Sequence, residues 1–151
     1  MKPVAMSVFV VCIAVLTLGA AFGAEKKVKL RDLPQPVRKT VLEQTKGAQL
    51  KGVSKEVENG KTMYEAETVV NGRSRDFVID AAGTVVEVED DVALDSIPAP
   101  AKAAIEKSAG SGKILKVESV TKGTTVTYEA ELLKGGKKSE VAVAADGSVQ
   151  K

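Results

Sequence analysis

The stretch Tyr64-Glu65-Ala66-Glu67 occurs a second time as Tyr128-Glu129-Ala130-Glu131, 64 residues further along the chain. The same offset joins further residues on both sides of the motif without an insertion. The matched pairs are prolines, apolar residues and a glycine: Pro34 with Pro98, Pro36 with Pro100, Val41 with Ile105, Val53 with Val117, and Gly83 with Gly147. An internal repeat constrains the architecture more strongly than any single segment, so the sequence predicts two units built to one plan.

Each unit is predicted to open with a short amphipathic helix, over residues 33–46 and 97–109. Asp32 and Ser96 stand before these segments as candidate N-caps, and the prolines that follow are tolerated in a first helical turn. Side chains that suit a buried helix face recur every four residues, at Val37, Val41 and Thr45 in the first unit and at Ala101, Ile105 and Ala109 in the second.

Alternating apolar and polar residues follow each helix and are divided by short turns. The turn signals are Asn59-Gly60, Asn71-Gly72 and Ala81-Ala82-Gly83 in the first unit, and Lys122-Gly123, Gly135-Gly136 and Asp146-Gly147 in the second. Tight turns between successive strands allow only antiparallel neighbours. The predicted fold class is therefore α+β, with two tandem repeats, each one helix followed by a four-stranded antiparallel meander whose last strand is shorter in the second unit.

One sheet face of each unit should pack on its helix. Units of this size lie near the lower limit of independent stability, so we expect the two units to pack on each other or to share a sheet. The predicted core residues are Val53, Tyr64, Ala66, Phe77 and Ile79 in the first unit, and Val117, Tyr128, Ala130, Val141 and Val143 in the second.

The N-terminal residues have the organisation of a secretory signal peptide. Lys2 precedes an apolar run from Val4 to Leu18, and small residues follow up to Ala24. The run is shorter than the roughly 20 residues that span a bilayer, so no stable membrane span is expected after cleavage. The alternative is an uncleaved N-terminal anchor. We expect a periplasmic or secreted protein with the order signal peptide 1–24, basic lead-in 25–31, first repeat 32–90 and second repeat 95–151. Glu89-Asp90-Asp91 and Asp95 are expected to mark the junction, as a polar linker of a few residues before the second helix.

The basic lead-in is expected to be a solvated tether. A sharper alternative is electrostatic attraction to an anionic envelope surface. The chain as a whole has a formal net charge of +2, far from the basic excess of nucleic-acid-binding proteins, so nucleic acid is not an expected partner.

Composition also argues against catalysis. The chain has no histidine, and its one cysteine, Cys12, lies in the predicted signal peptide. The usual nucleophile–base pairs and most transition-metal sites therefore lack their residues, and no other spacing predicts a reaction. We expect no enzyme activity, no cofactor, and no catalytic or metal-binding residues.

Acidic residues on the predicted strands are the best candidates for a binding surface. The Asn71-Gly72 turn places Glu67 opposite Asp76, and the Gly135-Gly136 turn places Glu131 opposite Glu140, while Glu65 and Glu129 extend each row. We expect these six residues on the outward side of the sheets, as a patch that receives a basic partner segment or a hard cation such as Ca²⁺. The alternative is a solvated strand face balanced by nearby lysines, namely Lys61, Lys137 and Lys138.

The order of elements resembles the PepSY-like family of exported bacterial domains, also described as β-lactamase-inhibitor-like. The residues that carry the resemblance are Leu33-Pro34, Tyr64-Glu65-Ala66-Glu67 and Gly83, with Ile97-Pro98, Tyr128-Glu129-Ala130-Glu131 and Asp146-Gly147 as their counterparts. The resemblance implies tandem helix-plus-sheet units, export, no enzymatic activity, and a binding or inhibitory role toward envelope proteins such as peptidases.

The function expected from the sequence is thus an exported, non-enzymatic protein-binding module with an inhibitory role toward an envelope or secreted protein such as a peptidase. The alternative is an envelope ion-binding protein of the calcium type or a stress-related accessory protein. A third route to binding is the addition of a partner strand to an open sheet edge. The sequence leaves the oligomeric state open.

Overall fold

A single antiparallel sheet of eight strands forms the body of the protein, and each strand pairs with its neighbours in chain order. The computed structural model describes residues 25–58 and 60–150. The predicted signal peptide, residues 1–24, lies outside the described residues. The strands are β1 (Lys26–Val28), β2 (Gln49–Glu58), β3 (Lys61–Val70), β4 (Arg73–Asp80), β5 (Val85–Asp91), β6 (Lys113–Lys122), β7 (Thr125–Lys134) and β8 (Lys137–Ala144).

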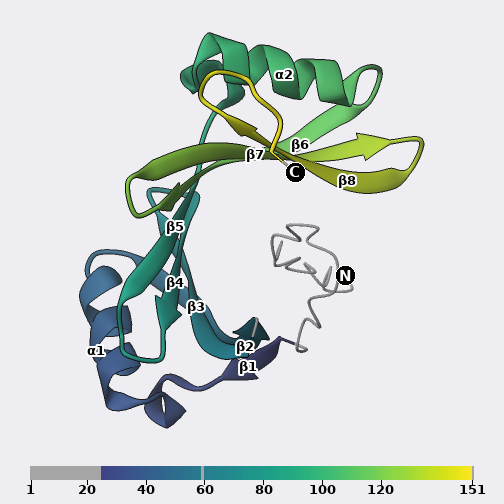
Figure 1. Cartoon of the computed structure of the whole chain (residues 1–151). Coiled ribbons are helices and arrows are strands. Elements are labelled where there is room, and N and C mark those ends of the chain that lie inside the picture. Colours follow the sequence, from purple (N-terminus) through teal and green to yellow (C-terminus); the bar gives the residue numbers. More distant parts are fainter. Residues whose placement is uncertain (1–24, 59, 151) are drawn as a thin grey trace.

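The helices are α1 (Gln35–Gln44) and α2 (Ala99–Ala109), each preceded by a short 3₁₀ turn, η1 (Leu30–Asp32) and η2 (Leu94–Ser96). In Figure 1 the sheet curls so that both helices lie on its outer side and the opposite face lines the inside of the curve. We call this second surface the inner face. In the part of the chain that the structure describes, no helix has the length and apolar character needed to cross a membrane.

This architecture contradicts the predicted pair of four-stranded repeats. Four strands follow α1, but only three follow α2, and all of them belong to one sheet. Residues 148–150 form a single bridge, Val143 to Val149, where a fourth strand was expected. Of the two arrangements expected for the units, packing together or sharing a sheet, the structure shows the shared sheet.

The joint between the halves lies within the sheet. Residues 89–91, expected to begin a polar linker, belong to β5, which pairs with β6 from Val88 opposite Thr121 to Asp91 opposite Glu118. The prediction for residues 89–91 was wrong because the pattern of a short charged run does not show which strand pairs with it. Its partner, β6, lies about thirty residues further along the chain.

The basic lead-in is also part of the sheet. Lys26–Val28 forms β1, which pairs with β2 in the register Lys27 opposite Ser54 and Val28 opposite Val53. The expected solvated tether is therefore wrong for these residues, because β2 supplies the backbone partners that a three-residue strand lacks on its own.

The helices begin two residues later than predicted, and the prolines determine the residue at which each helix begins. Leu33 and Ile97 are extended, since each is followed by a proline, and Pro34 and Pro98 take the N-cap positions. Asp32 and Ser96 are therefore not the caps that the sequence predicted, since Pro34 and Pro98 hold those positions. The hydroxyl of Ser96 donates instead to the carbonyl of Ala93 at 2.7 Å.

The turns follow the sequence closely. Asn71 and Gly72 have φ values of 51° and 82°, and the strands on either side pair Val70 with Arg73. Two consecutive turn residues with positive φ match the twist of the flanking strands. Asn59 lies outside the described residues, but β2 and β3 meet in the register expected of that turn, with Glu58 opposite Lys61.

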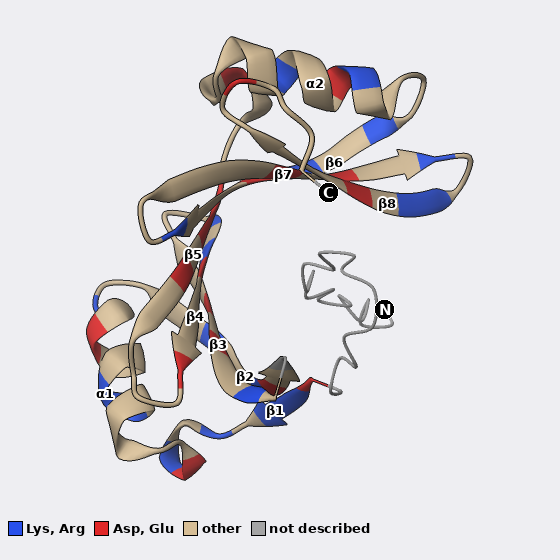
Figure 2. Ribbon diagram, in the orientation of Figure 1, with Lys and Arg blue, Asp and Glu red and all other residues tan. Residues whose placement is uncertain are grey.

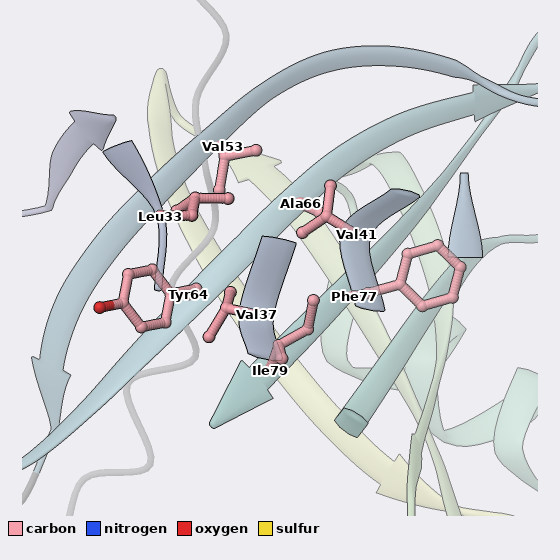
Figure 3. Close-up of a cluster of buried hydrophobic side chains, with 8 residues drawn as sticks. All are labelled: Leu33, Val37, Val41, Val53, Tyr64, Ala66, Phe77 and Ile79. Carbon is pink, nitrogen blue, oxygen red and sulfur yellow. The ribbon is translucent and has the colours of Figure 1, made fainter. Parts of the chain in front are cut away.

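Each helix covers an apolar cluster on the outer side of the sheet. Figure 3 shows Val37 and Val41 of α1 over Tyr64, Phe77 and Ile79 of the sheet. All five residues predicted for the first core are buried. In the second core Val117, Ala130 and Val143 are buried, whereas Tyr128 and Val141 are only partly buried, and Leu132 joins the cluster without having been predicted.

Candidate functional site: the inner acidic face

Successive side chains of a strand point to opposite faces of the sheet, so they lie alternately in the cores and on the inner face. Because Ala66 and Phe77 lie in the first core, their neighbours Glu65, Glu67 and Asp76 project to the other side of the sheet. Ala130 places Glu129 and Glu131 in the same way. All six predicted site residues are therefore on the inner face.

The predicted cross-strand pairs have the expected register. Glu131 and Glu140 are direct partners on β7 and β8. Glu67 and Asp76 fall opposite each other between the pairs Ala66 with Phe77 and Val69 with Ser74. This confirms the positions of these residues, while their role in binding stays a prediction.

The joint between β5 and β6 brings further carboxyl groups onto the face, which sequence reasoning missed. Glu89 lies opposite Asp76, and Asp91 lies opposite Glu118, which in turn lies opposite Glu129. Two rows result, the first row (Glu67, Asp76 and Glu89) and the second row (Asp91, Glu118 and Glu129), and they meet on β5. With Glu65, Glu87, Glu131 and Glu140 they form the inner acidic face. Figure 2 shows acidic positions, in red, on strands of both halves of the sheet.

Several of these carboxyl groups are buried, contrary to the expected solvated strand face. The exposed fractions of Glu65, Glu67, Glu118 and Glu129 are 9, 7, 7 and 8%. The sheet curls toward this side (Figure 1). Burial makes their charge costly, because a carboxylate loses hydration that only a partner can replace.

Four lysines compensate part of the face. The Nζ atom of Lys116 lies 2.5 Å from Oε1 of Glu118, and that of Lys122 lies 3.2 Å from Oε2 of Glu87. Lys27 lies 3.6 Å from Glu67, and Lys138 pairs with Glu131. Of the three lysines expected to balance the face, Lys138 is the one for which the structure shows a pairing with a predicted site residue.

Other carboxyl groups of the inner acidic face have no cationic partner in the part of the chain that the structure describes. Glu65 and Glu89 make no hydrogen bond or ion pair with another described residue. Asp76 accepts a hydrogen bond from the backbone N–H of Thr68 at 2.8 Å. Glu140 on β8 lies close enough to Glu129 to disfavour a negative charge there, so that burial and this neighbour together favour the protonated form of Glu129.

These surroundings hold protons on the face at neutral pH. Burial, followed by the charges of Asp76 and Glu67, raises the pKa of Glu65 to about 8. Burial, with Glu87 and Glu118 as the next contributors, raises the pKa of Glu89 to about 9. Burial raises the pKa of Asp76 to about 6, against the Thr68 hydrogen bond, which lowers it. Burial and the neighbouring Glu140 raise the pKa of Glu129 to about 8.

The two tyrosines and Asp80 contribute to the fold. Tyr64 is a core residue, as expected, and Tyr128 lies at the edge of its core. Asp80, the last residue of β4, accepts at Oδ1 from the backbone N–H groups of Ala82 and Thr84 and so holds the turn that follows. Within residues 25–58 and 60–150, no group of three His, Cys, Asp or Glu side chains is arranged to hold a metal ion.

Solved structures from Bacteroides share this fold. A B. eggerthii structure described as "putative periplasmic proteins" is 18% identical with a TM-score of 0.65, over 79% of this chain and 86% of that one. A DUF2874 family protein of B. ovatus is 18% identical with a TM-score of 0.60, over 79 and 85%. A BLIP-like protein of B. fragilis is 15% identical with a TM-score of 0.57, over 79 and 84%.

At these identities the likeness establishes the fold alone. The β-lactamase-inhibitor-like part of the predicted resemblance is supported at that level, and the PepSY-like part stays a prediction. The sequence matches no protein-family model, and it matches no curated protein.

Proposed function

We propose that the protein is an exported, non-enzymatic binding module that receives a basic segment of an envelope or secreted protein on its inner acidic face. In its sharper form the proposal is inhibition of that partner, for example a peptidase. Membership of the PepSY-like group is part of the same proposal.

The observation that carries the proposal is the incomplete compensation of the inner acidic face. Ten carboxyl groups share the surface, and the ion pairs found there involve four lysines. Direct like-charge neighbours such as Asp76 and Glu89 destabilise a sheet. A surface that lowers the stability of its own protein in this way is explained by a partner that supplies the missing charge.

Two observations support export, one from the sequence and one from a solved structure with the same fold. The N-terminal pattern is that of a secretory signal peptide, and one of the structures with this fold is described as periplasmic. A non-enzymatic role is supported by the composition, which lacks histidine throughout.

The test is capture of one defined partner from the native envelope fraction. The mature protein is immobilised and compared with the double variant Glu67→Lys plus Glu131→Lys, which reverses two charges on the inner acidic face. We expect one envelope protein to be retained by the wild type and lost by this variant.

A matched control reverses two acidic residues on the outer side. Glu43 and Glu106 lie on α1 and α2 with half-exposed side chains, and each has a lysine four residues earlier in its helix. The double variant Glu43→Lys plus Glu106→Lys changes the net charge equally and should retain the partner. Equal capture by all three proteins would contradict binding through the inner acidic face.

A further inference from the structure

Among the described residues, the lysines leave one part of the inner acidic face without cations. The lysine pairs lie at Glu67, Glu87, Glu118 and Glu131. Between them Glu65 and Glu89 have no ion pair or hydrogen bond with any described residue. The uncompensated position therefore lies where the two rows meet, around Glu89.

Glu67, which lies opposite Asp76 in the first row, provides a second sign that something binds here. Its Oε1 atom is buried and accepts no hydrogen bond from a described residue, since the Nζ atom of Lys27, at 3.6 Å, is too distant to donate one. Buried polar groups are satisfied in the great majority of native structures, and one left without a donor costs free energy. A ligand that brings donors to this position would recover that free energy.

The groups that face Glu89 come from every neighbouring strand. Asp76 lies directly opposite on β4, and Glu65 contributes from β3. Glu87 shares β5, while Glu118 and Glu129 contribute from β6 and β7. The nearby lysines, Lys116 and Lys122, are engaged with Glu118 and Glu87. A cation placed at Glu89 would therefore meet several carboxyl groups at once.

We propose that an arginine side chain of the partner segment is seated between Asp76 and Glu89, with Glu65 as a further acceptor. This inference rests on the proposed function and names the chemistry of its partner. A guanidinium group suits the position because its planar set of five donors can bridge two carboxyl groups on neighbouring strands, whereas an ammonium acts as a point charge. A single metal ion suits it less, since no described group of three ligands is arranged around one centre.

Seating the guanidinium releases protons. In the free protein the pKa of Glu89 is about 9 and that of Glu65 about 8, so both carry protons at pH 7. Around Glu65 the further charged groups are Glu67 on its own strand, Glu25, Glu56 on β2 and Lys27 on β1. A nearby positive charge favours the ionised form and lowers both pKa values toward the ordinary range.

Affinity is therefore linked to pH. Between the lowered pKa in the complex and the raised pKa of the free protein, each proton released strengthens binding by up to about tenfold per pH unit. Above the free pKa the dependence ends, because no proton remains to be displaced.

The experiment is calorimetric titration of the mature protein with an acetylated, amidated peptide of alternating glycine and arginine containing three arginines. Matched peptides carry lysine, or citrulline as the uncharged isostere of arginine. Titrations at pH 7.5 in phosphate and in Tris, whose ionisation enthalpies differ, measure the protons released. We expect the arginine peptide to bind on the order of tenfold more tightly than the lysine peptide, the citrulline peptide not to bind, and the observed enthalpy to differ between buffers.

The variant Glu89→Gln removes one of the two bridged carboxylates with little change of shape. It should weaken the arginine peptide by on the order of tenfold and reduce the number of protons released. The control Glu106→Gln on α2 should leave both quantities unchanged, and a thermal melt of each variant verifies folding. Equal binding by the arginine and citrulline peptides, identical enthalpies in the two buffers, or no effect of Glu89→Gln would each overturn the inference.

Failure here is distinguishable from failure of the proposed function. An envelope protein that is lost with Glu67→Lys plus Glu131→Lys but retained undiminished by Glu89→Gln would uphold binding on the inner acidic face and reject the arginine seat. Peptide binding as described, with no envelope protein captured, would uphold the seat and reject the proposed partner.

Discussion

Asp76 on β4 and Glu89 on β5 are direct cross-strand partners, so two acidic side chains oppose each other at the centre of the inner face. Sheets usually place opposite charges or apolar groups in such positions, because like charges destabilise the pair. The pKa values of about 6 for Asp76 and about 9 for Glu89, raised first by burial, show how the free protein tolerates the contact. At neutral pH the free protein keeps Glu89 protonated.

The first prediction concerns stability and pH. The folded pKa values of Glu65, Glu89 and Glu129, about 8, 9 and 8, lie above the ordinary values of the unfolded chain. The folded protein therefore binds more protons than the unfolded chain, and its stability should fall as pH rises from about 4.5 toward 9. A loss of even about 2 kcal/mol would lower the melting temperature by roughly 5–10 °C.

Differential scanning calorimetry at pH 5, 6, 7, 8 and 9 measures this dependence. The melting temperature should be highest near pH 5 and lowest near pH 9. A melting temperature that rises over the same range would show that the carboxyl groups are ionised at little cost in the folded protein.

The second prediction isolates Glu89. The variant Glu89→Gln removes the carboxylate that forms at high pH but keeps a neutral group of the same shape. It should raise the melting temperature at pH 9, by roughly 5 °C if about 1 kcal/mol is recovered, and change it little at pH 5. The exposed control Glu43→Gln should have no comparable pH dependence, and equal effects of both variants would count against a buried, uncompensated Glu89.

The third prediction concerns the lysine within the second row. Burial opposes the charge of Lys116, but the hydrogen bond with Glu118 and the charge of that carboxylate outweigh it and raise the pKa of Lys116. Lys116→Met leaves Glu118, 7% exposed, without its cation. We expect a loss of about 1–3 kcal/mol in the free energy of unfolding at pH 7, measured by urea denaturation.

Lys137→Met is the matched control, since Lys137 is exposed at the first position of β8, where it pairs with Lys134. It should change the free energy of unfolding by less than about 0.5 kcal/mol. If both lysine variants were equally stable, the ion pair at Glu118 would be irrelevant to the fold.

The fourth prediction uses two glycines at equivalent places in the halves. A Cβ atom at Gly83 would lie 2.8 Å from the carbonyl carbon and oxygen of Pro36, and one at Gly147 would lie 2.7 Å from the carbonyl oxygen of Pro100. Both glycines also have positive φ, 88° and 86°. Alanine at either should cost about 2–4 kcal/mol, through backbone strain together with displacement of the helix start.

Gly72 separates the two contributions. Its φ is 82°, but no atom lies within 4 Å of an added Cβ, so Gly72→Ala should cost only the backbone strain of about 1 kcal/mol. Thermal melts of the three variants provide the comparison. Equal losses would mean that the contact with the helix start contributes nothing.

The local features of the fold were predictable because they depend on short-range chemistry. Asn71-Gly72 specified its turn, and Tyr64 and Ala66 were correctly assigned to the core from alternation. The pairing of β5 with β6 was not predictable, because the alternation of β5 does not identify which strand lies beside it. Because Glu89 was assigned to the linker, it was not predicted to lie at the centre of the inner acidic face.

The burial of the acidic residues was likewise beyond sequence reasoning. Glu129 alternates with core residues just as a solvated glutamate would. Its 8% exposure depends on the curl of the sheet and on Glu118 across β6 and β7, a pairing of residues eleven positions apart. The positions of the six predicted carboxyl groups were thus correct, whereas their electrostatic surroundings needed the whole sheet.

The most direct test is a carbon-detected NMR titration of the glutamate carboxyl groups, in the free protein and with the arginine peptide. The account predicts midpoints near 9 for Glu89 and near 8 for Glu65 in the free protein, both shifted well downward by the peptide. Midpoints of about 4–5 in the free protein, or raised midpoints that the peptide leaves in place, would contradict a face kept protonated until a cationic partner arrives.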